Sequence, residues 1–342
     1  MLTTQKIASF KLQLAESKKI VIVTHYNPDG DALGSSLALY SFFRNNGYRV
    51  CCIAPNSFPN FLDWMPGTDT ILMAHKHLIT ARKIISEADI IFAVDMNAAH
   101  RVGKDLEASI LESSAYKIMI DHHPSPNLPC NIVYSSTKSS STCELVYHFL
   151  IECFKDKNII SLEMANCIYT GIITDTGSLS YLCNDPKTYS VLEHLVSIGV
   201  DGEAIHRMIY DNYSESRLRL LSISLKNMKI MYEHKTSYIF LSKKELVENN
   251  FNDGDAEGFV NYGLSIRGII FTAFFIEREN RIRISFRSKG NFDVNTFAST
   301  YFLGGGHKNA SATYHYDTLE NTISYFEDIV RKHPELKTDT VK

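Results

Sequence analysis

The stretch KIVIVTHYNPDGD, residues 19–31, joins a short apolar run to a loop that carries one histidine and two aspartates. An apolar run rich in isoleucine and valine, closed by a proline and glycine turn, predicts a rigid buried strand. His25, Asp29 and Asp31 follow this strand directly. Gly30 between the aspartates allows a sharp turn that presents each carboxylate to a different ion. The stretch therefore predicts a strand followed by a loop that binds two neighbouring metal ions.

Length and composition indicate a folded protein of two domains. The chain has 342 residues, of which 44% are hydrophobic and 21% charged, as in ordinary globular proteins. Its formal net charge of -3 offers no broad cationic surface, which argues against binding of long duplex nucleic acid. A local cluster of arginines could still serve a short anionic ligand.

The cysteine pattern and the lengths of the apolar runs predict the cellular compartment of the protein. The seven cysteines precede residue 184 and form no C-x-x-C pair, which predicts reduced thiols rather than disulfides or a thiolate zinc site. The first residues alternate polar and apolar types, as in an amphipathic helix, and form no secretory signal. No apolar run has the length needed to span a bilayer. We therefore expect a cytoplasmic protein that has no membrane partner.

The order of apolar runs predicts an α/β fold with two different sheets. From residue 20 to about 185, short apolar runs alternate with helical patterns, which is typical of a parallel sheet. Beyond a helical connector the pattern changes to that of a smaller mixed α/β domain. The predicted boundaries are 1–195 for the first domain, 196–230 for the connector and 231–342 for the second domain. The expected strands are 20–23, 49–53, 90–94 and 117–120, then 238–241, 268–276 and 281–286, with helices over 32–46 and 319–331.

Further metal-type side chains follow the other predicted strands of the first domain. Asp95 ends one apolar run, and the triplet Asp121-His122-His123 ends the next. Because the carboxyl ends of parallel strands meet at one edge of a sheet, these groups should converge with the first loop. A lone aspartate at such a place is more often a helix cap, but capping does not predict the whole set. Asp175, within the segment YTGIITDTG, is a further candidate near the end of a helix.

At these residues the chain resembles the DHH phosphoesterase superfamily, which is named for the triplet at 121–123. The segment GGGHKNASA, residues 304–312, resembles the glycine-rich motif of the DHHA1 domain that accompanies it. The resemblance implies a DHH catalytic domain, a DHHA1 substrate-binding domain and an active site in the cleft between them. Length and motif order are similar to those of NrnA-like enzymes. These hydrolyse short oligoribonucleotides (nanoRNA) and 3'-phosphoadenosine 5'-phosphate (pAp), and in some lineages pApA or cyclic dinucleotides.

The resemblance also implies a dinuclear metal site. His25, Asp29 and Asp95 would hold one ion, and Asp95 would bridge to a second ion. Imidazole and carboxylate ligands without thiolates suit two Mn²⁺ ions and admit Mg²⁺. The ligands implied for the second ion are Asp31, Asp95, His122 and Asp175.

Other residues match positions of the family that surround the metals. Asp121 would orient an imidazole, and His123 would contact the phosphoryl group or protonate the leaving oxygen. Arg101 matches an Arg-x-Gly position and would bind phosphate, although a structural ion pair is a close alternative. In the second domain the implied substrate-binding residues are Arg267, Arg287, Gly304, Gly305, Gly306 and His307, with the glycines expected to bring N–H groups close to a phosphate.

The sequence leaves some alternatives open. It does not choose among nanoRNA, pAp, pApA and cyclic dinucleotides as substrates, and it leaves open the direction of cleavage and whether the chain forms a homodimer. A lysine-rich motif typical of manganese pyrophosphatases is absent from the C-terminal part. An alternative from another functional class is a nucleotide sensor that has lost catalytic activity. Ligand-capable side chains at every expected metal position disfavour that alternative.

Overall fold

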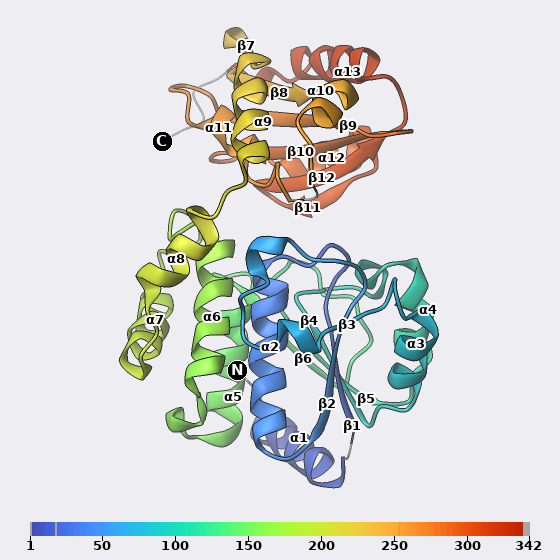
Figure 1. Ribbon diagram of the computed structural model, residues 1–342, viewed down its shortest axis with the longest axis vertical. Helices are drawn as coiled ribbons and strands as arrows, with labels where there is room; N and C mark the ends of the chain where they lie inside the picture. Colours follow the sequence, from blue (N-terminus) through green and yellow to red (C-terminus); the bar gives the residue numbers. More distant parts are fainter. Residues whose placement is uncertain (1, 18, 253, 338–342) are drawn as a thin grey trace. The chain divides into compact units, whose positions relative to one another are not determined.

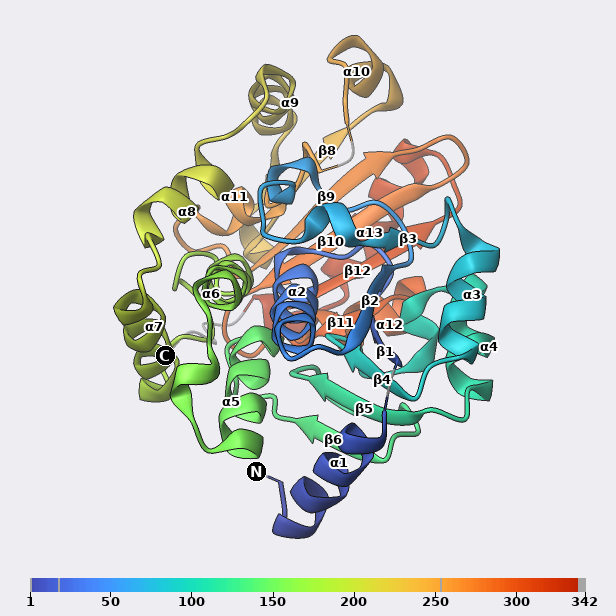
Figure 2. The same cartoon turned by 60° about the horizontal axis from the view of Figure 1, so that its bottom comes forward.

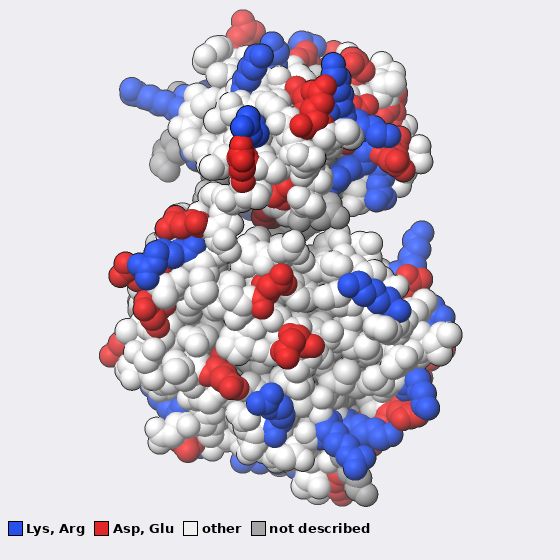
Figure 3. Space-filling model, in the orientation of Figure 1, with Lys and Arg blue, Asp and Glu red and all other residues white. Residues whose placement is uncertain are grey.

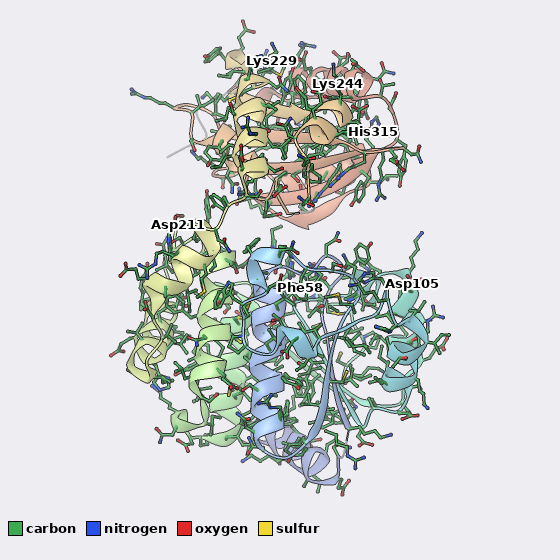
Figure 4. All side chains as sticks on the ribbon, viewed as in Figure 1. Phe58, Asp105, Asp211, Lys229, Lys244 and His315 are labelled. Carbon is green, nitrogen blue, oxygen red and sulfur yellow. The ribbon has the colours of Figure 1, made fainter. Side chains whose placement is uncertain are left out.

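The structure, a computed structural model, describes residues 2–17, 19–252 and 254–337. The chain divides into unit 1, Met1–Asn212, and unit 2, Tyr213–Lys342. Asp211, labelled in Figure 4, follows helix α8 (Gly202–Tyr210) next to this boundary. The predicted connector over 196–230 is therefore divided between the two units.

Unit 1 is built on a parallel sheet. Among the described residues this sheet has six strands in the order β3-β2-β1-β4-β5-β6, and its neighbouring strands pair in parallel. The strands are β1 (Lys19–Val23), β2 (Arg49–Ala54), β3 (Leu72–Met73), β4 (Ile90–Val94), β5 (Tyr116–Asp121) and β6 (Ile132–Ser135).

Helices cover both faces of this sheet because its central strands are apolar on both sides. Ile20 and Ile22 of β1 face one core, whereas Val21 and Val23 face the other. Figures 1 and 2 show α2, α5 and α6 on one face and α3 and α4 on the other. The helices are α1 (Thr4–Glu16), α2 (Gly30–Asn45), α5 (Thr142–Phe154), α6 (Leu162–Asp175), α7 (Pro186–Ile198) and α8 around the first core, and α3 (Leu78–Ser86) and α4 (Lys104–Glu112) around the second.

Two glycines let α2 and α6 pack closely together. A Cβ atom on Gly34 would lie 2.5 Å from the carbonyl oxygen of Cys167. A Cβ atom on Gly171 would lie 2.1 Å from Sγ of Cys143. Larger side chains would separate these helices, so Gly34 lets α2 approach α6, and Gly171 lets α6 approach Cys143 of α5.

Unit 2 is built on a mixed sheet. Its order among the described residues is β11-β12-β10-β9-β8-β7, with parallel pairing between β8 and β9 and antiparallel pairing elsewhere. The strands are β7 (Lys229–Met231), β8 (Thr236–Leu241), β9 (Phe271–Glu277), β10 (Ile282–Ser288), β11 (Gly305–His307) and β12 (Ala310–His315).

Aromatic side chains fill one core of unit 2, and aliphatic side chains contribute most of the other. Phe271, Phe275 and Phe286 pack against Phe297 and Phe326 on one face. On the opposite face, helices cover β8 and β9. The helices are α12 (Val294–Phe302) and α13 (Leu319–Arg331) on the first face, and α9 (Glu215–Lys226), α10 (Lys243–Glu248) and α11 (Val260–Leu264) on the second.

The predicted fold class is confirmed: an α/β chain with a parallel sheet and a second, mixed sheet. Within the described ranges, no helix is both long and apolar enough to cross a bilayer. On the face shown in Figure 3, positive and negative side chains are interspersed within each unit, as expected for a net charge of -3.

Candidate metal centre

The carboxyl ends of the strands in unit 1 gather the predicted metal ligands. His25 follows β1, and Asp95 follows β4. His122 follows β5, which ends at Asp121. Helix termini supply the remaining candidates, because Asp29 caps α2, Asp31 lies in its first turn, and Asp175 ends α6.

Donor atoms from these elements form two groups that meet near Asp95. In the first group, Nε2 of His25 lies 3.2 Å from Oδ2 of Asp95 and 3.9 Å from Oδ2 of Asp29. In the second group, Nε2 of His122 lies 3.5 Å from Oδ2 of Asp175 and 3.9 Å from Oδ2 of Asp31. The same nitrogen lies 3.7 Å from Oδ1 of Asp95. Asp95 thus directs one oxygen toward each group.

The backbone at Asp95 is in an uncommon conformation. Its φ angle is 57°, in the left-handed region that side chains other than glycine, asparagine and aspartate rarely adopt. The Asp95 N–H donates to the carbonyl of Ile120, which keeps the residue beside the end of β5. Such strain concentrates at functional sites, where surrounding contacts hold it in place.

The first turn of α5 holds two of the carboxylates. The N–H groups of Thr142 and Cys143 donate to the two oxygens of Asp31, at 2.7 and 2.8 Å. The hydroxyl of Thr142 donates to Oδ1 of Asp95 at 2.9 Å. Amides of a first helical turn have no partner within the helix and carry partial positive charge, so they suit a carboxylate. Thr142, which the sequence did not suggest, therefore contacts both Asp31 and Asp95.

The sequence contained a signal for this helix start. The run SSST at 139–142 precedes an apolar segment, and serines are favoured N-cap residues. Ser141 caps α5 by accepting from the N–H of Glu144. The signal predicts where a helix begins, but it does not predict that the start of this helix contacts two aspartates from other parts of the chain.

Local hydrogen bonds orient His25 and Asp29. Nδ1 of His25 lies 2.9 Å from the carbonyl oxygen of Tyr26, which fixes its hydrogen on Nδ1 and a lone pair on Nε2. Nε2 is buried and makes no hydrogen bond among the described residues. Oδ1 of Asp29 accepts from the N–H groups of Asp31 and Ala32. Asp29 is therefore a helix cap, and its second oxygen faces His25.

The pKa values show that the pocket attracts positive charge. Burial lowers the pKa of His122, but the charges of Asp175 and Asp95 outweigh burial and raise it to about 9. Burial raises the pKa of Asp31 well above its ordinary value, and nearby carboxylates raise it further. Burial alone would raise the pKa of Asp95, yet the neighbouring imidazoles of His25 and His123 hold it below its ordinary value.

The donor set fits two divalent cations. Four carboxylates, those of Asp29, Asp31, Asp95 and Asp175, match the charge of two such ions, and two imidazoles complete the groups. Oxygen and imidazole donors without thiolate suit Mn²⁺ and admit Mg²⁺. The lone pair on Nε2 of His25 faces a carboxylate, which is an arrangement that a shared cation stabilises.

Asp121, His123 and Arg101 lie beside this set. Asp121 is fully buried, and its two oxygens accept from Nδ1 of His123 at 2.8 Å and from the His123 N–H at 3.1 Å. Asp121 therefore fixes the orientation of the His123 ring. Arg101 is half-buried, and its carbonyl accepts from the N–H of Tyr26.

The residues predicted to bind substrate lie in unit 2, where the structure brings some of them onto one face of the sheet. Arg287 of β10 pairs with Ala310 of β12, which pairs with His307 of β11. Directly paired residues point to the same side, so Arg287 and His307 share a face. Arg267, by contrast, is exposed in a turn after α11, and the strand predicted from residue 268 begins only at Phe271.

The three glycines lie at the edge of the sheet in unit 2. Gly305 and Gly306 belong to edge strand β11, and Gly304 directly precedes it. A Cβ atom on Gly304 would lie 2.6 Å from the carbonyl oxygen of Ala312, and one on Gly306 would lie 2.4 Å from that of Ala310. The glycines therefore permit close approach of β11 to β12.

Comparisons with known proteins identify the family. A family model described as "DHH family, N-terminal domain" matches residues 19–172, and one described as "DHHA1 domain" matches residues 235–332. The chain belongs to the DHH family. The predicted resemblance is thus confirmed, and the first model covers every candidate metal ligand except Asp175.

Relatives of this DHH family member carry names that describe phosphoesterases. The probable bifunctional oligoribonuclease and PAP phosphatase NrnA of Streptococcus mutans is 27% identical over 94% of this chain and 98% of its own length. The cyclic-di-AMP phosphodiesterase PdeA of Listeria monocytogenes is 24% identical over 88% of this chain, which spans 45% of PdeA. A solved structure of an exopolyphosphatase-related protein from Bacteroides fragilis is 42% identical, with a TM-score of 0.94, and covers 98% of this chain and 100% of its own.

Proposed function

We propose that the chain is a metal-dependent phosphoesterase that hydrolyses short oligoribonucleotides and pAp. The observation that carries this proposal is the convergence of two donor groups on the two oxygens of Asp95. Two cations bound at neighbouring sites would supply an activated water nucleophile and would neutralise charge at the reacting phosphorus. The similarity to NrnA over nearly the whole chain supports the substrate class.

The residues of unit 1 would have different roles around this centre. His25, Asp29 and Asp95 would hold one ion, and Asp31, Asp95, His122 and Asp175 the other. His123, oriented through Nδ1 by Asp121, would present Nε2 to the phosphoryl group or the leaving oxygen. Arg101, beside His25, would bind a phosphate oxygen.

The residues of unit 2 would recognise the substrate. Arg287 and His307 share one face of the sheet, and a guanidinium can grip a phosphate through two parallel hydrogen bonds. Arg267 and the segment Gly304–Gly306 would contribute further contacts to the nucleotide.

Hydrolysis of a nucleotide panel tests the proposal. Purified protein with Mn²⁺ should release phosphate from pAp and mononucleotides from di- to pentaribonucleotides, and Asp95→Ala should release neither. A cyclic dinucleotide and pApA belong in the same panel, because PdeA is named for cyclic-di-AMP hydrolysis. Preference for those two substrates would replace the oligoribonuclease assignment, and binding without turnover of any nucleotide would favour a sensor.

A further inference from the structure

Among the described residues of unit 2, helices cover only one half of one face of the sheet. On this face Phe274 and Ile276 of β9 pack beneath Leu220 of α9 and Phe259 beside α11. Beyond β9, the same face continues over β10, β12 and β11, where side chains are half-buried or exposed. Helix α12 packs on the other side of these strands, so their open side faces away from that core. We call the open side of β10, β12 and β11 the open face.

The strand register assigns the residues of the open face to three rows. Each row crosses the strands at directly paired positions. Strand β12 ends at His315, which is labelled in Figure 4. The first row is Arg287, Ala310 and His307; the second is Ser285, Ala312 and Gly305; the third is Arg283 and Tyr314.

In these rows, small residues in the middle are flanked by cationic and aromatic side chains. The middle positions carry alanine, serine and glycine, which leave the backbone accessible to a planar ligand. Arg283 and Arg287 point to this side from one strand, and Arg281 lies in line with them. The guanidinium of Arg281 lies 4.0 Å from the ring centroid of Tyr314, whose exposure is 36%. None of these row positions carries a carboxylate.

This pattern fits a single-stranded oligoribonucleotide. Alternate residues of a strand are about 7 Å apart, so Arg283 lies about 7 Å from Arg281 and about 14 Å from Arg287, with Ser285 in between. Arginines that follow a phosphate backbone and an aromatic ring on which a base stacks are the usual elements of single-strand binding. An acidic peptide would contact the arginines, but it would not require the row of small residues or Tyr314.

We propose that the open face is a binding track for the nucleotides of an oligoribonucleotide beyond the one held by Arg287 and His307. The track rests on the proposed function, and it extends the predicted substrate site along β10. Arg283 and Arg281 bind successive phosphates, and Tyr314 stacks on a base. The track therefore makes no contribution to a substrate as short as pAp.

Substrate length is the variable that tests the track. Arg283→Gln and Tyr314→Ala should lower kcat/KM for a tetraribonucleotide by roughly fivefold and tenfold, and much less for pAp. Arg219→Gln is the matched control, because this exposed arginine of α9 pairs with Glu215 and the substitution removes the same charge. Equal losses for both substrates, or no loss for the tetranucleotide, would overturn the track.

A binding measurement separates this inference from the proposed function. A labelled tetraribonucleotide in EDTA should bind to the wild-type protein, and the slope of log affinity against log salt should shrink by about 0.7 in Arg283→Gln. Failure of the wild-type protein to hydrolyse any nucleotide would sink the proposed function but leave this measurement valid. Absence of binding by the wild type, or binding unaffected by both substitutions, would overturn the track.

Discussion

Asp95 serves two neighbours at once, and its backbone conformation makes this geometry available. The left-handed φ of 57° turns the side chain back over the sheet edge after β4. One oxygen lies near His25, and the other accepts from Thr142. A residue in a regular extended conformation at this position would direct its side chain elsewhere.

Asp95→Asn separates the charge of this residue from its conformation. Asparagine tolerates the left-handed region, so the fold should be retained while the carboxylate is lost. We expect the bound Mn²⁺ per chain to fall and turnover to fall by more than about a hundredfold. Metal analysis, circular dichroism and pAp hydrolysis measure these effects, with Asp69→Asn as an exposed control. Two bound Mn²⁺ ions and normal turnover in Asp95→Asn would refute a bridging role.

Thr142→Val tests whether the hydroxyl between the two carboxylates positions them. Valine keeps the shape and the backbone N–H but removes the bond to Asp95. We expect Mn²⁺ affinity, measured by calorimetric titration, to weaken by roughly ten- to a hundredfold, and Thr142→Ser to restore it.

Thr170→Val is the matched control for Thr142→Val. Thr170 is equally buried, but its hydroxyl donates to the carbonyl of Asn166 within α6. A similar loss of Mn²⁺ affinity in both valine variants would show that burial of a threonine, rather than its contact with Asp95, controls the affinity.

At the scale of elements, the start of α5 depends on Glu144. This buried carboxylate accepts from the N–H and hydroxyl of Ser140 and from the hydroxyl of Thr188 in α7. Burial alone would raise its pKa, but the His148 imidazole at 3.5 Å and hydrogen bonds from Ser140 and Thr188 lower it to about 2. Glu144 thus holds the segment whose amides contact Asp31.

The lowered pKa of Glu144 predicts a pH-dependent contribution to stability. A carboxylate with a folded pKa of about 2 and an ordinary value of 4.5 stabilises the fold above pH 4.5. This contribution, on the order of 3 kcal/mol, is lost as the pH falls from 4.5 toward 2. Glu144→Gln should therefore lower the free energy of unfolding at pH 7, and the gap from wild type should narrow at pH 3. Urea unfolding of the metal-free proteins measures both, and a gap independent of pH would contradict the prediction.

Side-chain patterns predicted the central elements well and the sheet edges poorly. Four strands of the parallel sheet were predicted because each is an apolar run, but β3 has two residues and β6 has four. Strands β11 and β12 consist largely of small residues, which resemble a loop in sequence. The candidate ligands could be predicted because they follow strong strands. The contacts of Thr142 could not be predicted, because the sequence does not show that the start of α5 lies beside Asp31 and Asp95.

At the scale of the whole molecule, the candidate metal ligands and the candidate recognition residues belong to different units. The metal ligands predicted from the sequence lie within Met1–Asn212, whereas Arg287 and His307 lie within Tyr213–Lys342. Each unit has its own sheet and its own hydrophobic cores.

Arg287→Ala and His307→Ala test this division of labour. Loss of a charged contact to phosphate should raise KM for pAp by about tenfold, while two Mn²⁺ ions remain bound per chain. Arg219→Ala, which removes an exposed arginine of α9, should change neither quantity. Loss of Mn²⁺ in Arg287→Ala would show that the two tasks are not separate.

Confinement of the candidate ligands to one unit has an evolutionary consequence. A gene fusion or exchange that replaced the C-terminal module would keep the predicted metal ligands, since the hydrogen bonds that hold Asp31 and Asp95 are made within Met1–Asn212. New specificities could then arise by recombination of modules, without simultaneous change of chemistry and recognition.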